Sequence, residues 1–350
     1  MITGDQVSRV IMAEADRIGL EAPGRVTVLD DQDGSLLLAA AERWPDAGLA
    51  WYCDDLADER ACRAAAEAAG ITALADDDLD AATAGSALCL ARLPKSLDAL
   101  DLRASTLAGR ADPPVIMIAG GRVKHLTRSM NTVLERHFGE VRGSLGLGKA
   151  RALVAAGPRD GAAEPEPHRA TVTGLEVVAY GGVFAGAALD PGTRLLLDQA
   201  DRFPAAETAI DLGCGTGLIA ATLARRFPNA TVTAIDSSHE AVRSARATAA
   251  ANGLAERIDV RRGDGLAEIP DQSAELIVCN PPFHRGTAKD SSTALAMIKD
   301  AARVLRPGGE LWLVYNTHLP YRSTLRTMIG PTDLIAQDRS YLVTRSRRPD

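Results

Sequence analysis

The residues Asn280, Pro281, Pro282 and Phe283 combine an amide, a rigid corner and an aromatic ring. An exocyclic amine is a poor nucleophile because its lone pair is delocalised, so a catalyst must hold that lone pair toward an electrophile. The Asn280 carboxamide oxygen and the Pro281 carbonyl can each accept one N–H, and the locked φ of proline fixes their direction. Phe283 can stack on a planar group, worth roughly 1–3 kcal/mol per base. These four residues are candidate catalytic residues; a proline turn that merely closes a strand is the structural alternative.

A glycine-rich turn lies 63 to 67 residues earlier, in the stretch AIDLGCGTG. Gly213, Gly215 and Gly217 tolerate positive φ and leave room for a ligand against the backbone. The amides that open the following helix favour a carboxylate or a phosphate. Leu218 stands where a dinucleotide fingerprint has its third glycine, which disfavours a nicotinamide or flavin enzyme. Asp211, before the glycines, is expected to hold a cationic amine or to orient the turn.

Two further acids follow the next strands of the same block. ATVTAID ends at Asp236, which is expected to accept the hydroxyls of a ribose, and RIDVRRGDG ends at Asp264, which could reach an adenine amino group. The strand ELIVCN brings Asn280 to the same edge, where open α/β sheets bind ligands. Each of these Asp residues, considered alone, could equally be the N-cap of a helix. Together they predict one ligand site around the glycine turn.

The elements that must position these residues alternate between short apolar runs and Ala-rich helical stretches, which predicts βαβ units and a mostly parallel sheet. Residues 155–170 are rich in proline and glycine and read as a linker. With 350 residues, two domains are expected, at 1–158 and 170–350. An ungapped offset of 183 aligns Pro45 with Pro228 and Gly34 with Gly217, which favours a duplication. On that alignment the first copy lacks the acids and most of the glycines, so it is expected to keep the fold and lose the ligand site.

Residues 208–280 resemble a class I S-adenosylmethionine-dependent methyltransferase, and RVLRPGGELWLV resembles the helix–turn–strand of that family. The resemblance implies two Rossmann-like domains, S-adenosylmethionine as cofactor, and cofactor contacts from Asn280 as well as the glycine turn and its acids. NPPF resembles the (N/D)PP(Y/F/W) motif of amino-group methyltransferases. That motif leaves open adenine N6, cytosine N4, guanine N2 and protein glutamine amides as substrates.

Nearly the whole chain resembles the tandem-domain bacterial ribosomal RNA guanine-N2 methyltransferases. The resemblance rests on YGGVFAGAALDPGTRLLLDQ (180–199), NPPFHRG and VYNTHLPY, and in the first half on ARLPKSLDAL, GGRVKHLTRSMNTVLERHFG and LGLGKARAL. It implies that Asn280, Pro281 and Phe283 hold the guanine amino group, with Gly182, Val183 and Phe184 at the entrance. The first half is slightly closer to the large-subunit members.

Charge is distributed unevenly along the chain, whose net charge is -7. Residues 1–100 carry 8 basic and 19 acidic side chains, whereas residues 120–151 carry 7 basic and 2 acidic ones. A local basic segment in an acidic protein suits phosphate contacts with RNA, although a solvated helix face is the alternative. An RNA base must leave its stack to enter the pocket, which favours single-stranded targets. The candidate RNA-binding residues outside the catalytic motif are Phe184, Lys95, Arg122, Lys124, Arg128, Lys149 and Arg285.

Five scattered cysteines without metal-ligand spacing predict free thiols in a reducing cytoplasm and no metal site. No apolar run reaches membrane-spanning length, and charges in the N-terminal helical pattern argue against a signal peptide. We therefore expect a cytoplasmic monomer whose partner is ribosomal RNA or a ribosomal subunit, with no membrane and no metal.

The leading hypothesis is S-adenosylmethionine-dependent N2 methylation of one guanosine in ribosomal RNA, with the large subunit slightly favoured. The alternative enzyme is an amino methyltransferase acting on adenine N6 or on a protein glutamine amide. The degenerate first copy and the basic segment argue against that enzyme. An alternative of another class is a non-catalytic RNA-binding protein of ribosome assembly. The complete NPPF motif and both acids, Asp236 and Asp264, disfavour it.

Overall fold

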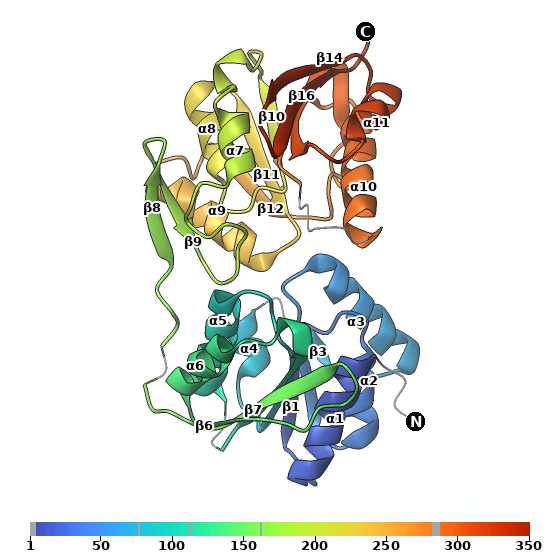
Figure 1. Ribbon diagram of the computed structural model, residues 1–350, viewed down its shortest axis with the longest axis vertical. Coiled ribbons are helices and arrows are strands. Elements are labelled where there is room, and N and C mark those ends of the chain that lie inside the picture. The colour runs from blue at the N-terminus through green and yellow to red at the C-terminus, as the bar shows by residue number, and fades with distance from the viewer. Residues whose placement is uncertain (1–4, 76–77, 112–113, 162, 282–287) are drawn as a thin grey trace. The chain divides into compact units, whose positions relative to one another are not determined.

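The computed structural model describes residues 5–75, 78–111, 114–161, 163–281 and 288–350. The chain divides into two compact units, Met1–Glu166 and Pro167–Asp350 (Figure 1). Each unit is a seven-stranded sheet covered by helices on both faces, and unit 2 has an additional hairpin. This arrangement confirms the predicted tandem Rossmann-like α/β fold. The ends of the predicted linker are part of β7 and β8, the strands on either side of the boundary.

The sheet of unit 1 has the order β3-β2-β1-β4-β5-β7-β6, with β6 and β7 antiparallel. Its apolar helix faces form two cores: α1, α2 and α3 pack on one face of the sheet, and α4, α5 and α6 on the other. The strands are β1 (Arg25–Leu29), β2 (Gly48–Tyr52), β3 (Leu74–Ala75), β4 (Leu88–Arg92), β5 (Ile116–Arg122), β6 (Phe138–Gly143) and β7 (Ala150–Pro158). The helices are α1 (Gln6–Ile18), α2 (Ser35–Arg43), α3 (Leu56–Ala69), α4 (Leu79–Thr83), α5 (Leu97–Arg110), η1 (Val123–His125) and α6 (Arg128–His137).

Unit 2 repeats this topology, with the order β12-β11-β10-β13-β14-β16-β15. Helices α7, α8 and α9 pack on one face of the sheet and α10 and α11 on the other. The strands are β8 (His168–Val172), β9 (Leu175–Ala179), β10 (Thr208–Leu212), β11 (Thr231–Asp236), β12 (Ile258–Arg262), β13 (Ala274–Cys279), β14 (Leu305–Asn316), β15 (Thr332–Gln337) and β16 (Tyr341–Arg347). The helices are α7 (Pro191–Leu197), η2 (Ala200–Arg202), α8 (Leu218–Arg226), α9 (His239–Ala251), α10 (Ala288–Val304) and α11 (Tyr321–Met328).

The two units repeat at the offset of 183 that the sequence alignment uses. The bounds of β1 and α2 correspond residue for residue to those of β10 and α8. Gly34 (φ 75°) and Gly217 (φ 77°) both precede the helix in the left-handed conformation, and Asp30 (φ 54°) keeps the positive φ of Gly213 (φ 75°). Asp is among the few residues other than glycine that adopt this conformation readily. Gln32, which aligns with Gly215 (φ 51°), does not have a positive φ, so the turn of unit 1 keeps the left-handed conformation at its first and last positions but not at the middle one.

Two elements differ from the sequence expectation. The third strand of unit 2, β12, ends at Arg262, two residues before Asp264, so Asp264 lies in the following loop. The Pro-Gly-Gly segment is no simple turn, because β14 runs through it. Ala274 pairs with Leu305 and Leu276 pairs with Glu310, so the extra residues of β14 bulge out, with Gly308 at φ 77°.

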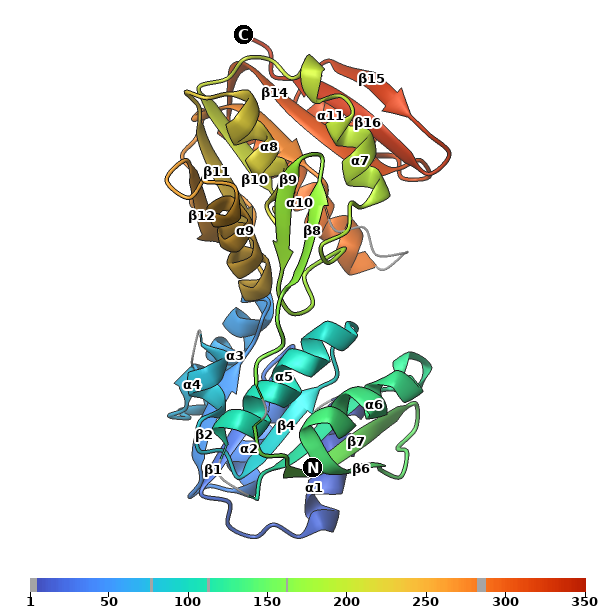
Figure 2. The ribbon, with the colours of Figure 1, turned by 90° about the vertical axis from the view of Figure 1, so that its left-hand side faces the viewer.

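The β8–β9 hairpin joins unit 2 through α9, and Figure 2 shows the hairpin beside that helix. The Val178 amide donates to Thr248 Oγ1 at 3.0 Å, and the Tyr180 amide donates to Ser244 Oγ at 2.9 Å. These bonds fix the start of the segment 180–190, which leads to α7.

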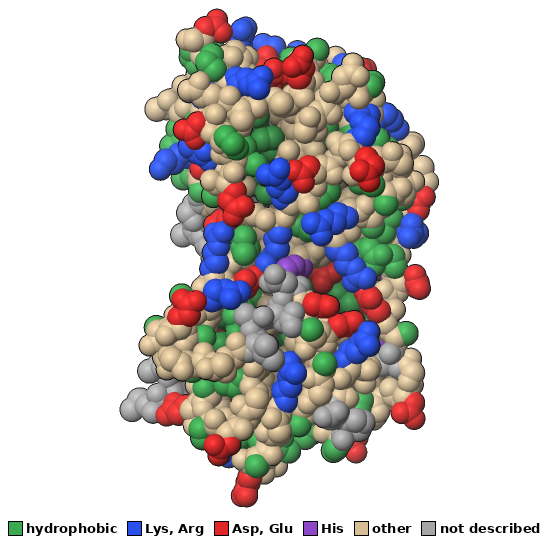
Figure 3. All heavy atoms as spheres, turned by 180° about the vertical axis from the view of Figure 1, so that it is seen from behind, with side chains coloured by type: hydrophobic (Ala, Val, Ile, Leu, Met, Phe, Trp, Pro, Cys, Tyr) green, Lys and Arg blue, Asp and Glu red, His purple; other side chains and the backbone are tan. Residues whose placement is uncertain are grey.

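Acidic and basic side chains are interspersed over each of the two units in the view of Figure 3.

Candidate functional site

The register of unit 2 places Asn280 beside the glycine turn. Strands β10 and β13 are parallel neighbours, and Leu212 pairs with Cys279. Gly213 and Asn280 therefore leave the sheet together at its carboxyl edge. Both strands are buried over almost their whole length, as expected for a parallel sheet covered on both faces.

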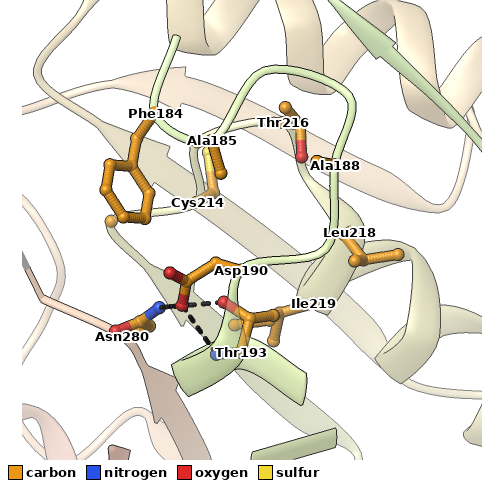
Figure 4. A pocket seen from close by; sticks show the side chains of 12 residues that line it. Phe184, Ala185, Ala188, Asp190, Thr193, Cys214, Thr216, Leu218, Ile219 and Asn280 are labelled. Carbon is orange, nitrogen blue, oxygen red and sulfur yellow. Dashed lines mark hydrogen bonds between the residues drawn. The ribbon is translucent and has the colours of Figure 1, made fainter. Parts of the chain in front are cut away.

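A cleft opens at this edge (Figure 4). The glycine turn forms one wall, the segment 184–193 forms another, and Asn280 comes from the strand end. Phe184 lines the cleft and is 59% exposed, so its ring is accessible to a ligand. Val183, expected beside it, packs instead against Ala179 and Ala241 in a small core. Gly182 is not among the residues that line the cleft.

The side chain of Asn280 is held through its nitrogen (Figure 4). Asn280 Nδ2 donates to Asp190 Oδ2 at 3.1 Å and to Thr193 Oγ1 at 2.8 Å. Asp190 caps α7, because its Oδ2 also accepts the Thr193 amide at 2.9 Å. Among the described residues no donor is bonded to Asn280 Oδ1, so the acceptor end of the amide is available.

The glycine turn is shaped both for packing and for access. The amides of Gly213 and Cys214 donate to the Ile235 carbonyl at 2.9 and 3.0 Å, which ties the turn to β11. A Cβ at Gly217 would lie 2.9 Å from Ala245 Cα, so glycine is required for the approach of α8 to α9. A Cβ at Gly215 would meet nothing within 4 Å, so the turn is open on that side.

Asp211 is fully buried beneath the turn. Its Oδ2 accepts the Ala220 amide at 2.8 Å, whereas its buried Oδ1 has no hydrogen-bond partner. Burial, with a further contribution from the charge of Asp236, raises the pKa of Asp211 to about 7. A buried acceptor without a partner is costly, and a cationic amine would satisfy it. The residues present therefore fit the amine of an amino-acid-like cofactor.

Asp236 joins β11 to the turn. Its Oδ2 accepts the Gly215 amide at 2.9 Å, and its Oδ1 accepts the Ser238 amide at 3.1 Å. Asp264, by contrast, is exposed and is not among the residues that line the cleft. Asn280, Phe184 and the glycine turn line the cleft, Asp211 and Asp236 adjoin it through their bonds to the start of α8 and to the turn, and Asp264 lies in the loop after β12.

Part of the predicted catalytic motif cannot be placed. Pro281 is buried directly after Asn280, but Pro282, Phe283 and Arg285 lie outside the described residues. Sequence reasoning also missed Asp190 and Thr193, the partners of Asn280. The stretch LDPGT contained the signal for this cap, since an Asp before a Pro that opens a helix is a typical N-cap.

A second group of candidate residues lies at the carboxyl edge of the unit 1 sheet. Arg92 pairs with Gly120 and Arg122 pairs with Ala150, so the loops after β4 and β5 and the start of β7 meet there. Five exposed cations of these segments, which we call the basic edge, are Lys95, Arg122, Lys124, Arg128 and Lys149, whereas Arg151, also exposed, donates to the Ser144 carbonyl.

The basic edge differs from the other cations of the same region. No ion pair to its five members occurs within the described residues, whereas Arg136 pairs with Asp101 and Arg142 pairs with Glu14. The apolar side chains of Val123 and Leu147, which are 50% and 42% exposed, lie in the same loops. Free cations beside exposed apolar groups are the expected composition of a surface that binds phosphates and unstacked bases.

The turn of unit 1 that corresponds to the glycine turn is filled by its own side chains. Arg92 is only 8% exposed and donates to Ser8 Oγ at 2.8 Å, to Asp5 at 3.1 Å and to Asp31 Oδ1 at 3.4 Å. Asp31 is fully buried and accepts the Leu36 amide at the start of α2. Cys53, which aligns with Asp236, has no carboxylate to offer a ribose.

Arg103 closes the other side of this turn. It is 3% exposed, bonds to Asp30 Oδ2 at 3.1 Å, and lies over the Tyr52 ring at 4.9 Å. The ion pairs of Arg92 and Arg103 therefore occupy the carboxyl edge of the unit 1 sheet. In unit 2 the cleft opens at the corresponding edge of its own sheet.

No group of three or more His, Cys, Asp or Glu side chains in the described part of the chain is arranged to hold a metal ion. None of its helices is both long and apolar enough to cross a membrane.

This fold and site define a methyltransferase. Residues 174–345 match the methyltransferase small domain, and residues 9–159 match the RLMG N-terminal domain. A solved structure similar in fold is the T. thermophilus 16S rRNA N2 G1207 methyltransferase (RsmC) in complex with AdoMet and guanosine. It has a TM-score of 0.79 and 22% identity, over 99% of this chain and 93% of that one.

Curated relatives identify the family. Ribosomal RNA large subunit methyltransferase G of Streptomyces avermitilis is 35% identical over 341 residues, 94% of this chain and 88% of that protein. Its namesake in Streptomyces coelicolor is 37% identical over 73% of this chain and 71% of that protein. The chain belongs to the ribosomal RNA large subunit methyltransferase G family. The predicted family, enzyme class and cofactor, S-adenosylmethionine, are confirmed.

Proposed function

We propose that this protein transfers a methyl group from S-adenosylmethionine to the exocyclic N2 amine of a guanosine in large-subunit ribosomal RNA. The names of the relatives support the large subunit, and the guanosine in the related solved structure supports the base. The observation that carries the chemistry is the Asn280 carboxamide, held by its nitrogen with its oxygen available beside the glycine turn.

The cofactor, when bound, supplies an electrophilic methyl group. The chain's own residues orient the nucleophile: Asn280 Oδ1 and the Pro281 carbonyl each accept one N–H, which aims the nitrogen lone pair. Phe184, together with Phe283, supplies flat apolar surface for the base. Correct orientation is the main contribution, and no strong base is needed because the proton can leave after transfer.

The cofactor is assigned to the carboxyl edge of unit 2. Asp211 would accept its cationic amine, the turn formed by Gly213, Gly215 and Gly217 would lie against its amino-acid portion, and Asp236, which is bonded to the Gly215 amide of that turn, would accept the ribose hydroxyls. Asp264 could approach the adenine from the loop after β12.

The two domains are assigned different tasks. Residues 170–350 form the catalytic domain, and residues 1–158 form a degenerate methyltransferase-like domain that recognises RNA through the basic edge. The filled turn around Arg92 supports a first domain without cofactor. The protein is proposed to act as a cytoplasmic monomer on ribosomal RNA or a ribosomal subunit.

The proposal is tested by transfer of a tritiated methyl group from S-adenosylmethionine to ribosomal RNA that lacks the modification, to both subunits and to release factors. Label is expected in large-subunit RNA, at guanine N2 after digestion to nucleosides. N280A is expected to lower turnover by at least about 100-fold while cofactor affinity persists. Label only in protein or in adenine would replace the proposal by the alternative amino methyltransferase, and binding without transfer would support an assembly protein.

A further inference from the structure

The two ends of an asparagine carboxamide have opposite hydrogen-bonding character, since the oxygen accepts and the nitrogen donates. An Asn at a substrate site can therefore bind an N–H group or a carbonyl oxygen, depending on which end faces the substrate. The orientation of Asn280 thus decides which chemical group the cleft selects.

Asp190 removes this ambiguity. A carboxylate only accepts, so the group 3.1 Å from Asp190 Oδ2 must be the nitrogen of Asn280. A flipped amide would place its oxygen against the carboxylate and lose the bond to Asp190, although the Thr193 hydroxyl, which can donate as well as accept, could still bond to it. Thr193 Oγ1, at 2.8 Å, accepts the second N–H. With both of its N–H groups engaged, Asn280 has only its oxygen left for a ligand.

The Asp190 carboxylate is itself held in place. Its Oδ2 caps α7 through the Thr193 amide, and Leu196 anchors that helix in the core with no exposed surface. Gly192 supports the cap, because a Cβ there would lie 3.0 Å from Asp190 Oδ2 and 3.2 Å from Tyr341. The partner of Asn280 is thus part of a rigid helix start, as a precise site requires.

We propose that Asp190, with Thr193, is a positioning residue that fixes the acceptor end of Asn280 toward the substrate. The pair thereby selects a nitrogen that carries hydrogen over a carbonyl oxygen. This inference deepens the proposed function and rests on it for the identity of the substrate amine. Asp190 acts through Asn280 and takes no part in the bond that forms.

The test exchanges the two side-chain types. N280D sets two carboxylates against each other, and like charges at this distance disfavour the required arrangement. D190N leaves an amide at each position. The double variant D190N/N280D restores one amide and one carboxylate, so the amide at 190 can donate while a second oxygen at 280 remains available to the substrate. D198N, the same chemical change at the exposed end of α7, is the matched control.

Methyl transfer to the RNA substrate is expected to fall about 100-fold or more in N280D and about 10-fold in D190N. The double variant is expected to exceed N280D by at least about 10-fold, and D198N is expected to equal the wild type. Circular dichroism and the thermal unfolding midpoint report correct folding of each variant. A double variant whose loss equals the product of the two single losses would overturn the inference.

A second readout does not depend on any RNA. The side-chain amide resonances of Asn280, identified by their absence in N280A, are expected to show slow exchange with water in the wild type and in D198N, and fast exchange in D190A. Unaltered exchange in D190A would refute the positioning role. If no RNA accepts a methyl group from the wild type, the proposed function fails, and this exchange measurement still decides the role of Asp190.

Discussion

The ionisation of Asp211 couples the stability of unit 2 to pH in a direction opposite to that of an ordinary carboxylate. Burial raises its pKa to about 7, from the value of 3.8 that is usual for an aspartate. The folded protein therefore holds a proton that the unfolded chain releases, and the stability this gives is complete below about pH 4 and lost as pH rises toward 7. At 1.36 kcal/mol per pKa unit, the whole effect is about 4 kcal/mol.

D211N is the sharpest perturbation of this group. The amide keeps the shape of the side chain, and its oxygen can still accept the Ala220 amide, but it cannot ionise. The difference in free energy of unfolding between wild type and D211N is expected to change by about 1.4 kcal/mol per pH unit between about pH 5 and 7. D211N gains relative to the wild type as pH rises, and the difference levels off above about pH 7.

Urea unfolding can follow unit 2 alone through Trp312, which is buried against Phe203. Trp44 and Trp51 lie in unit 1, so W44F/W51F serves as a common background. The control is D198N, because Asp198 is exposed, and its replacement should leave the pH dependence unaltered. A difference between wild type and D211N that stays constant from pH 5 to 8 would refute the assignment of a raised pKa to Asp211.

Two further predictions concern unit 1. Calorimetry on the full chain is expected to detect one S-adenosylmethionine site, because buried ion pairs fill the turn in unit 1, and two equivalent sites would contradict that interpretation. R122A/K124A is expected to weaken RNA binding and to reduce the salt slope by about 1.4 to 1.8, without loss of cofactor affinity. R43A/R110A, which removes the same charge from two cations already paired with acids, is the control. Equal losses of RNA affinity in both variants would remove the basic edge from the RNA-binding surface.

Much of the fold and of the cleft follows from local patterns in the sequence. Continuous apolar runs such as ELIVC predict strands buried on both faces, and parallel strands bring their following residues to one edge. That reasoning was enough to place Asp236 and Asn280 at the edge that carries the glycine turn. It was also enough to find the repeat, because Gly34 and Gly217 occupy the same left-handed turn position.

The remaining features depend on contacts between distant segments. Asp190 bonds to Asn280 across 90 residues, and no periodicity in the sequence encodes that pairing. The bulge at the Pro-Gly-Gly segment and the early end of β12 depend on register between strands, which local patterns do not specify. The third strand of unit 2 therefore ends two residues earlier than expected, and the predicted role of Asp264 toward an adenine stays a prediction.

Because Arg92 is buried in the turn of unit 1, the first copy could not easily regain a ligand site there. To reopen its turn, the chain would have to lose Arg92 or the acids that contact it, Asp5 and Asp31. Removal of one partner from the buried Arg92–Asp31 pair costs about 3–5 kcal/mol, which is a large part of the stability of a typical domain, whereas loss of Asp5, whose side chain is 43% exposed, costs less. Each single substitution that reopens the turn would thus lower the free energy of unfolding of unit 1. Only simultaneous substitution of Arg92 and its acidic partners would avoid this loss. Evolution of the first copy is therefore expected to proceed through substitutions on its surface, because substitutions at the filled turn cost stability.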